Sequence, residues 1–255
     1  MTKEAISEIK THLLNVTTLT DPYVTYLQAD ERKGVQKLLL QLQKRLEKEQ
    51  ALKEQFYHMQ TFERSCYQNG IHLVAGIDEV GRGPLAGPVV AAAVILPKDR
   101  VILGLNDSKQ LSEKKRIALA EEIKEQAVAF GIGEIPAEKI DQINIYQASK
   151  LAMIQAVEGL NMKPEHLLID AMSLDLPISQ EKIIKGDTRS VSIAAASIIA
   201  KVYRDNLMKE YHQQYPYYGF DKNAGYGTKA HLDGLAEHGI TEIHRKSYAP
   251  IKKYL

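Results

Sequence analysis

The sequence contains 255 residues, of which 44% are hydrophobic and 25% charged, which suits one globular domain with a small attachment. The formal net charge of +1 excludes a strong overall attraction to nucleic acid, so such binding would need a local basic patch. The single cysteine, Cys66, excludes an internal disulfide and a cysteine-rich zinc site. Because no apolar run approaches the length of a membrane span and no secretion signal is evident, we expect a soluble, cytoplasmic protein without a membrane partner.

Residues 1–70 are rich in charge and poor in turns, since Gly34 is the only glycine before Gly70. Leucines recur among these charges, and residues 40–49 have the composition of a helix. We predict two to four amphipathic helices that form a helical N-terminal extension, which packs on the main domain or helps to bind a partner. The predicted domains are therefore residues 1–70 and 71–255.

After the turn signal at Asn69-Gly70, apolar runs alternate with helical patterns. The apolar runs predict strands at residues 72–78, 89–96, 127–135, 167–170 and 182–185. The helical patterns predict helices at residues 113–125, 137–160 and 191–211, the first capped by Ser112 and the last by Ser190. Strands interleaved with helices indicate an α/β layer fold.

Carboxylates stand where three of these strands end. Asp78 and Glu79 close the first, Asp170 closes the fourth, and Asp187 follows the last. Because sites in open α/β sheets form at the carboxyl ends of strands, we expect these side chains to lie together. Neighbouring strand residues point to opposite faces, so we expect a bend or a bridging position at Glu79. The alternative role for each acid is a turn or helix cap, and this applies most to Asp187.

Four acids packed together would repel one another unless a cation neutralised them. Mg²⁺ prefers oxygen ligands and often uses a few carboxylates together with substrate phosphate. Two such ions could clamp the attacking water and the leaving oxygen of a phosphodiester. The pattern therefore predicts the metal-dependent chemistry of nucleases and polymerases.

The acids are followed by Gly81-Arg82-Gly83. A dinucleotide-binding loop would need a third glycine at another spacing and an acid further along the chain, and an ATP-binding loop would need Gly-Lys-Ser/Thr. A loop whose backbone and one arginine contact a sugar-phosphate fits better. Such a close contact between the loop backbone and a sugar can recognise a 2′-hydroxyl, the group that distinguishes RNA from DNA.

The segment after residue 200 is basic and rich in tyrosine. Tyr226, between two glycines, could stack on a sugar or base or could belong to an ordinary surface loop. Lys201 and Arg204 are three residues apart on one predicted helix and share a face, where they could contact phosphate or remain solvated. The histidines form no cluster at metal-binding spacing.

Six motifs, in this order, resemble the ribonuclease HII family over about residues 72–248: Gly76–Pro88, Asn106–Lys109, Leu168–Ala171, Lys185–Asp187, Ser192–Val202 and Gly225–Lys229. The resemblance implies a ribonuclease H-like fold, with a mixed five-stranded sheet flanked by helices and a helical C-terminal part. It also implies hydrolysis of the RNA strand of RNA/DNA hybrids and incision 5′ to single ribonucleotides in duplex DNA, which leaves 5′-phosphate and 3′-hydroxyl ends.

The same resemblance assigns roles to individual residues. It implies two divalent ions, Mg²⁺ or Mn²⁺, held by the catalytic acids Asp78, Glu79, Asp170 and Asp187. It implies 2′-hydroxyl recognition by the loop Gly81, Arg82 and Gly83, and stacking of Tyr226 on a deoxyribose. The implied phosphate contacts are Lys109, Lys201 and Arg204. The expected partners are RNA/DNA hybrid and ribonucleotide-containing duplex DNA, bound by a monomer.

Two alternatives stay open. The related ribonuclease HIII enzymes share the fold but carry a different residue between the loop glycines and a glutamate at the last acid, so Arg82 and Asp187 argue against them. A non-catalytic hybrid-binding module could use the basic, tyrosine-rich tail. The four acids argue against this module, because unneutralised carboxylates would repel phosphate.

Overall fold

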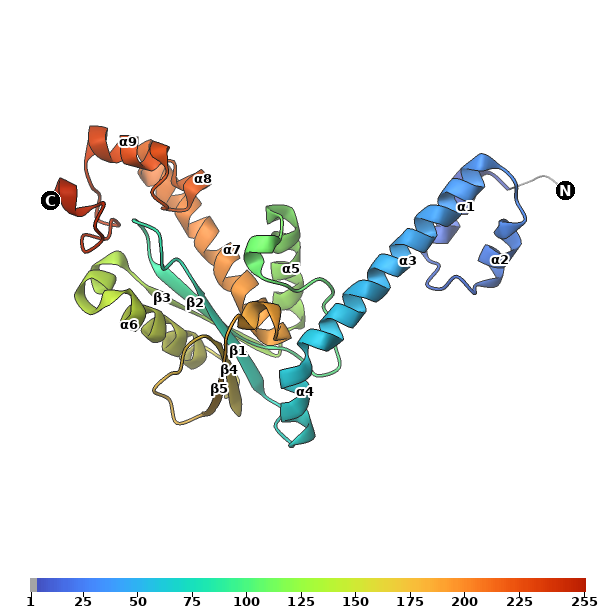
Figure 1. The fold of residues 1–255 in the computed structure, drawn as a ribbon, viewed down its shortest axis with the longest axis horizontal. Helices are drawn as coiled ribbons and strands as arrows, with labels where there is room; N and C mark the ends of the chain where they lie inside the picture. The colour runs from blue at the N-terminus through green and yellow to red at the C-terminus, as the bar shows by residue number, and fades with distance from the viewer. Residues whose placement is uncertain (1–3) are drawn as a thin grey trace. The chain divides into compact units, whose positions relative to one another are not determined.

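The computed structural model describes residues 4–255. Packing divides the chain between Phe56 and Tyr57 into two compact units (Figure 1), and the long helix α3 (Lys33–Met59) passes from one into the other. No helix within residues 4–255 is both long enough and apolar enough to cross a membrane.

The first unit consists of α1 (Ile6–Leu14), α2 (Pro22–Gln28) and the larger part of α3. Its own small core is formed by Ile9, Leu13, Val16, Val24, Leu27, Val35 and Leu42. The Arg45 side chain donates hydrogen bonds to the carbonyls of Leu13 and Leu14 in the last turn of α1 and to that of Val16 just after it. Together with α4 (Thr61–Gln68), four helices begin between residues 4 and 70, within the predicted range of two to four.

Helix α4 belongs to the second unit. Its Cys66 packs with Val74, Leu168, Ile183 and Ile193 of the sheet and of α7. The break in packing therefore precedes the compositional boundary near residue 70, because the buried side of α4 covers the sheet. A functional boundary at residue 70 stays a prediction.

The second unit contains one five-stranded sheet in the order β3-β2-β1-β4-β5. Its strands are β1 (Val74–Val80), β2 (Val89–Ile95), β3 (Ala129–Ile135), β4 (His166–Asp170) and β5 (Ser179–Ile183). The pairs β1–β2 and β2–β3 are antiparallel, whereas β1–β4 and β4–β5 are parallel. The mixed five-stranded sheet that the resemblance implied is thereby confirmed.

The last strand begins earlier than the predicted residues 182–185. The sequence at the start of β5, Ser179 to Lys182, is polar because β5 lies at the edge of the sheet and is largely solvent-exposed. The apolar periodicity that marks the central strands is therefore missing, and a prediction based on apolar runs finds only the end of β5.

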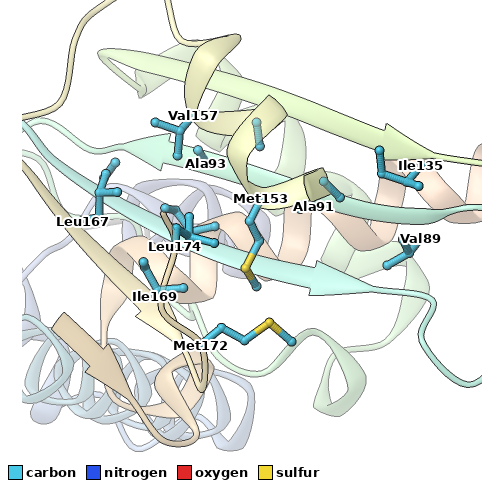
Figure 2. Close-up of a cluster of buried hydrophobic side chains, with 14 of the residues drawn as sticks. Val89, Ala91, Ala93, Ile135, Met153, Val157, Leu167, Ile169, Met172 and Leu174 are labelled. Carbon is cyan, nitrogen blue, oxygen red and sulfur yellow. The ribbon is translucent and has the colours of Figure 1, made fainter. Parts of the chain in front are cut away.

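Helices cover both faces of the sheet (Figure 1). Helix α6 (Ala137–Glu158) packs on one face, α7 (Val191–Gln214) packs on the other, and α5 (Glu113–Gln126) lies beside α7. The helices approach so closely that a Cβ at Gly76 would lie 2.0 Å from the Ser192 carbonyl carbon, and a Cβ at Gly133 would lie 2.0 Å from the Ala152 carbonyl oxygen. Apolar side chains fill the α6 face (Figure 2), among them Ala91, Ala93, Met153, Leu167 and Ile169.

The chain ends in short elements: α8 (Phe220–Asn223), α9 (Lys229–His238) and the 3₁₀ turns Pro216–Tyr218 and Lys252–Tyr254. Two further 3₁₀ turns, η1 (Ser108–Gln110) and η2 (Gly186–Thr188), lie close to the acidic end of the sheet. The short C-terminal elements pack around Met208, Phe220, Leu235 and Ile251, and this second core also includes Leu85 and Ala86 of the loop after β1.

Candidate active site

The sheet brings three of the four predicted acids to one end. Strands β1 and β4 run parallel with Ile77 opposite Ile169, so Asp78 and Asp170 follow at neighbouring positions. Glu79 is the next residue of β1, and Asp187 lies in η2 directly after β5. Asp170 also shapes the turn, because its Oδ1 accepts a hydrogen bond of 2.7 Å from the Gly186 N–H.

Asp78 and Glu79 point to opposite faces of the sheet. Gly76, two residues before Asp78, faces α7, whereas Ala75 and Ile77 belong to the core on the α6 face. The pairing of β1 with β2 continues without interruption through Val80. The antiparallel ladder therefore shows no interruption at Glu79, and a bridging position of its side chain stays a prediction.

Burial and mutual repulsion make the charged forms of these acids costly. Asp78 is 7% exposed, and its pKa is raised well above the usual value, first by desolvation and then by the negative charges of Glu79 and Asp170. The pKa of Glu79 is raised to about 7, again mainly by desolvation, while the Arg82 guanidinium opposes the shift. Desolvation likewise raises the pKa of Asp187.

A fifth acid, Asp107, lies near this cluster. After desolvation, its charge is the main cause of the raised pKa of Asp187, and the Lys109 ammonium acts in the opposite direction. The Asp107 Oδ1 accepts a 2.9 Å hydrogen bond from the Lys109 N–H, which starts the η1 turn. Asp107 has no predicted role from sequence, and the only signal for it there is its place in the motif Asn106–Lys109.

The acids have the chemistry of a site for hard cations. Oε2 of Glu79 is buried and has no hydrogen-bond partner, and Oε1 lies 3.5 Å from Nη1 of Arg82. Within residues 4–255, no three His, Cys, Asp or Glu side chains lie together in a way that could hold a metal ion by themselves. An open arrangement is expected of carboxylates that repel one another, and it leaves ligand positions for water and phosphate oxygens. The residues therefore fit divalent ions that share their coordination with a substrate.

Two buried arginines fold the glycine-rich loop, which comprises residues 81–88. Arg245 donates hydrogen bonds to the carbonyls of Gly81, Arg82 and Gly87, at 2.5 to 3.0 Å. Gly81 has φ +95°, and a Cβ there would lie 2.3 Å from Nε of Arg204, so this position requires glycine.

This packing decides which way the backbone of the loop points. In a trans peptide the N–H of one residue points opposite to the carbonyl of the residue before it. Since Arg245 binds the carbonyls of Gly81 and Arg82, the N–H groups of Arg82 and Gly83 point away from it, and both residues are exposed. The loop therefore presents two consecutive N–H donors and the half-exposed Arg82 side chain on one side.

The structure corrects the expectation for Arg204. Its side chain is 1% exposed and donates hydrogen bonds to the carbonyls of Ala86, Pro88 and Ala224. These bonds occupy the guanidinium inside the protein, so Arg204 is neither a phosphate contact nor a solvated residue. It joins the glycine-rich loop to the loop that carries Tyr226.

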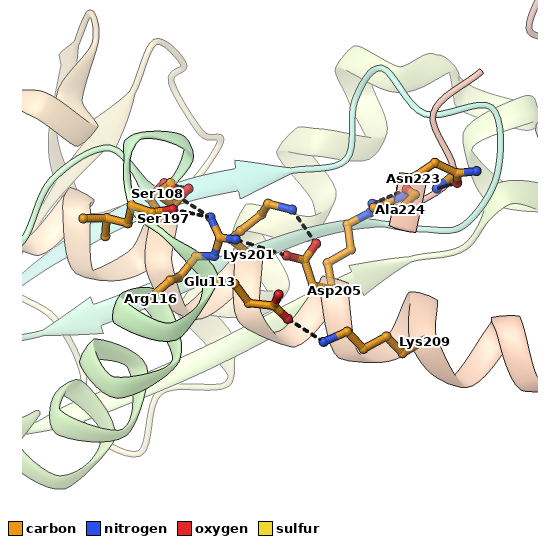
Figure 3. Close-up of polar contacts among 12 residues, drawn as sticks. Ser108, Glu113, Arg116, Ser197, Lys201, Asp205, Lys209, Asn223 and Ala224 are labelled. Atoms are coloured by element: carbon orange, nitrogen blue, oxygen red, sulfur yellow. Dashed lines mark hydrogen bonds and ion pairs between the residues drawn. The ribbon is translucent and has the colours of Figure 1, made fainter. Parts of the chain in front are cut away.

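Lys201 does not share the surroundings of Arg204. It forms an ion pair with Asp205, which also lies 3.8 Å from Arg116 of α5 (Figure 3). On the same helix, the Ser197 hydroxyl oxygen lies 3.0 Å from that of Ser108, and a hydrogen bond of Ser197 with Asp78 lowers the pKa of this acid. Lys201 thus belongs to a polar network beside the acids, and its role as a phosphate contact stays a prediction.

Tyr226 lies next to the glycine-rich loop. Its side chain is 46% exposed, and a Cβ at Gly83 would lie 3.3 Å from Cε1 of the ring. The Leu85 N–H donates to the Gly225 carbonyl at 2.8 Å, which connects the two loops through their backbones. An exposed ring beside two free N–H donors can stack on a sugar while the donors bind its neighbouring phosphate or hydroxyl.

Sequence comparisons agree with these features. The family model described as Ribonuclease HII matches residues 75–251, and the one described as Ribonuclease HII N-terminal domain matches residues 5–67. A curated ribonuclease HII of Enterococcus faecalis is 58% identical over 252 residues and covers 99% of both chains. That of Bacillus subtilis is 53% identical over 249 residues and covers 98% of both.

Solved structures show the same fold. Ribonuclease H2 from Pyrococcus horikoshii has a TM-score of 0.62 and 25% identity, covering 71% of this chain and 96% of its own. The ribonuclease HII of Archaeoglobus fulgidus, solved as a complex with PCNA, has a TM-score of 0.59 and 28% identity, covering 69% and 95%. Bst-RNase HIII in complex with Mn²⁺ has a TM-score of 0.57 and 21% identity, covering 74% and 71%, and supports the fold alone.

Proposed function

Because the chain belongs to the ribonuclease HII family, we propose that its strand-end acids bind divalent ions where the substrate backbone is cut. The family makes the chain a ribonuclease H, an endonuclease that hydrolyses the RNA strand of RNA/DNA hybrids. The proposal concerns the residues: Asp78, Glu79, Asp170 and Asp187 as ligands of two ions, Mg²⁺ or Mn²⁺.

The main support for this proposal is that few cationic side chains lie near the acids to neutralise their charge. Asp78, Glu79 and Asp187 all have raised pKa values, and one buried oxygen of Glu79 has no hydrogen-bond partner. Bound divalent ions would neutralise this repulsion, lower the pKa of a water molecule and stabilise charge on the phosphodiester oxygens.

The remaining residues act on the substrate around the cut. The N–H groups of Arg82 and Gly83 would donate hydrogen bonds to a 2′-hydroxyl or phosphate oxygen, and Arg82 would add a positive charge. Tyr226 would stack on the deoxyribose that follows the ribonucleotide. Lys109, which is exposed and lowers the pKa of Asp187, would face a phosphate. The chain would act as a monomer in the cytoplasm.

One assay tests the proposal. A DNA duplex with a single embedded ribonucleotide is incubated with the protein and Mg²⁺ or Mn²⁺, and the product ends are mapped. We expect a nick on the 5′ side of the ribonucleotide that disappears with a chelator. Tight, salt-sensitive binding without a nick would favour a hybrid-binding module, and cleavage of long RNA tracts alone would favour a ribonuclease HIII-like activity.

A further inference from the structure

Two buried histidines lie behind Tyr226 and take no part in the proposed chemistry. His231 of α9 is 0% exposed, and His244 of the C-terminal segment is 1% exposed. Their Nε2 atoms are 3.0 Å apart, which is a hydrogen-bond distance. A contact between two such nitrogens requires a proton on one of them and a lone pair on the other.

The neighbouring groups decide where that proton lies. The Thr241 N–H donates to Nδ1 of His244 at 2.9 Å, so this nitrogen carries a lone pair and the His244 proton is on Nε2. His231 must then accept at Nε2 and carry its proton on Nδ1. That proton points to the Tyr226 carbonyl, which lies 3.0 Å from Nδ1 and can only accept. The hydrogen bonds thus form one directed chain from Thr241 to Tyr226.

The surroundings keep both rings neutral. The rings of Tyr218 and Phe220 pack against His231 and His244. Desolvation lowers the pKa of both histidines, and that of His244 falls to about 4. A proton added to His231 would place two N–H groups face to face, so the chain of hydrogen bonds exists only in the neutral pair.

This chain connects the two parts of the substrate-binding surface. At one end it holds the backbone of Tyr226, whose ring lies beside Gly83. At the other end His244 pairs with Ala86 in an isolated bridge, and the adjacent Arg245 binds the carbonyls of Gly81 and Arg82. We propose that the His231–His244 pair is a positioning device that fixes the Tyr226 ring relative to the glycine-rich loop. The inference rests on the proposed substrate contact of Tyr226.

The proton positions can be tested on the unmodified protein. Long-range ¹H–¹⁵N spectra of histidine side chains distinguish the tautomers at neutral pH. We expect His244 with its proton on Nε2 and His231 with its proton on Nδ1. A proton on Nε2 of His231, or a charged ring at either position, would overturn the proposal whatever the substrate of the protein is.

Two substitutions separate the two contacts of His231. In His231→Asn the side-chain amide can occupy the place of Nδ1 and keep the bond to Tyr226, whereas in His231→Gln it reaches the place of Nε2 and keeps the bond to His244. On a duplex with one ribonucleotide we expect His231→Gln to raise KM about tenfold with kcat within about twofold, and His231→Asn to stay within about threefold of the wild type in KM.

The control is His238→Gln, on the same helix, where the ring stacks on Tyr217 at the surface and no change is expected. Equal KM values for both His231 variants, or a loss in kcat alone at unchanged KM, would contradict a positioning role. If both variants unfold, the tautomer spectra of the wild type still decide the question.

A double-mutant cycle separates this inference from the proposed function. If His231 acts through the Tyr226 ring, His231→Gln should have no further effect on KM in the Tyr226→Ala background. An additional tenfold rise in that background would refute positioning. A Tyr226→Ala variant with wild-type KM would instead refute the substrate contact of Tyr226, and the tautomer spectra would still report on the pair.

Discussion

The site contains two groups of charged side chains, the acids at the ends of β1 and β4 and the arginines beneath the glycine-rich loop. The two groups differ in the number of hydrogen-bond partners that the protein gives them. Arg204 and Arg245 each donate to three backbone carbonyls. Asp78 and Glu79 have few donors nearby and repel each other. A buried charge that is fully hydrogen-bonded stabilises the fold, whereas one that is poorly partnered indicates a ligand.

The largest effect should follow from removing one acid. Asp170→Asn keeps the size of the side chain and the acceptor for the Gly186 N–H but removes a charge. Substitution of a residue that only supports a metal ligand typically lowers metal affinity or activity about 10- to 100-fold. For a direct ligand we therefore expect kcat/KM to fall by at least about a hundredfold. Thermal unfolding without metal should be unchanged or occur at higher temperature, because repulsion is relieved.

The matched control for this prediction is Asp175→Asn, the same substitution at an exposed position of the same region. It should change neither activity nor stability. Equal activity of the Asp170 and Asp175 variants in Mg²⁺ would remove Asp170 from the site.

The next effect should follow from removing an arginine. Arg245→Met leaves the carbonyls of Gly81, Arg82 and Gly87 without their buried donor. We expect the free energy of unfolding to fall by about 3 to 5 kcal/mol, measured by urea denaturation, with a loss of activity because the loop is released. Arg100→Met, at an exposed turn, serves as the control. A stable Arg245 variant with an ordered loop would show that the carbonyls find other donors.

A pH dependence distinguishes the neutral histidine pair from the acids. The folded protein lowers the pKa of His244 from 6.5 to about 4, so the unfolded chain binds the proton more tightly. The stability contributed by the neutral ring is present above pH 6.5 and is lost as the pH falls toward 4, by at most about 3 kcal/mol. The acids with raised pKa values act in the opposite direction, since the folded state favours their protonated forms.

The contribution of His244 to the pH dependence of stability is measured by comparing the wild type with the His244→Gln variant. Below pH 6.5 the free energy of unfolding of this variant should fall less steeply than that of the wild type, as followed by urea denaturation at a series of pH values. Parallel curves for the two proteins would mean that His244 is not buried in its neutral form.

A smaller effect is expected at Glu63, a buried acid without a proposed catalytic role. Its Oε1 accepts hydrogen bonds from the Ser190 and Ser192 hydroxyls and from the Ser192 N–H at the start of α7, and desolvation raises its pKa. Glu63→Gln keeps an acceptor, so activity should stay within about twofold and the free energy of unfolding at pH 5 within about 1 kcal/mol.

As the pH rises through the folded pKa of Glu63, the wild type should lose stability relative to the Gln variant, because the folded state binds the proton more tightly. A large loss of activity in Glu63→Gln would mean that Glu63 communicates with the site.

The sequence was sufficient for the features that depend on local pattern. The apolar runs predict the central strands. Because Asp78, Asp170 and Asp187 follow such runs, the sequence also predicts that they lie together at the carboxyl ends of the strands. The glycines around Arg82 predict a close backbone approach. Each of these signals is contained in a few consecutive residues, which is why no three-dimensional information was needed.

The buried arginines and histidines that support the two loops could not be predicted from local sequence patterns. Arg204 is one of many arginines, and its burial depends on carbonyls at Ala86 and Pro88 that lie more than a hundred positions earlier in the chain. His231 and His244 are thirteen residues apart and meet only because α9 and the C-terminal segment pack on the same aromatic rings. Such pairs have no sequence spacing of their own, and tertiary packing alone brings them together.

The acids at the strand ends are proposed to bind the ions that the cut requires. The decisive experiment measures Mn²⁺ binding by calorimetry and incision of a single-ribonucleotide duplex on the same samples of wild type, Asp78→Asn, Glu79→Gln, Asp170→Asn and Asp187→Asn. We predict that ion binding and incision are lost together, while circular dichroism shows a folded protein. A folded variant that no longer binds Mn²⁺ but incises the duplex at the wild-type rate would contradict the account.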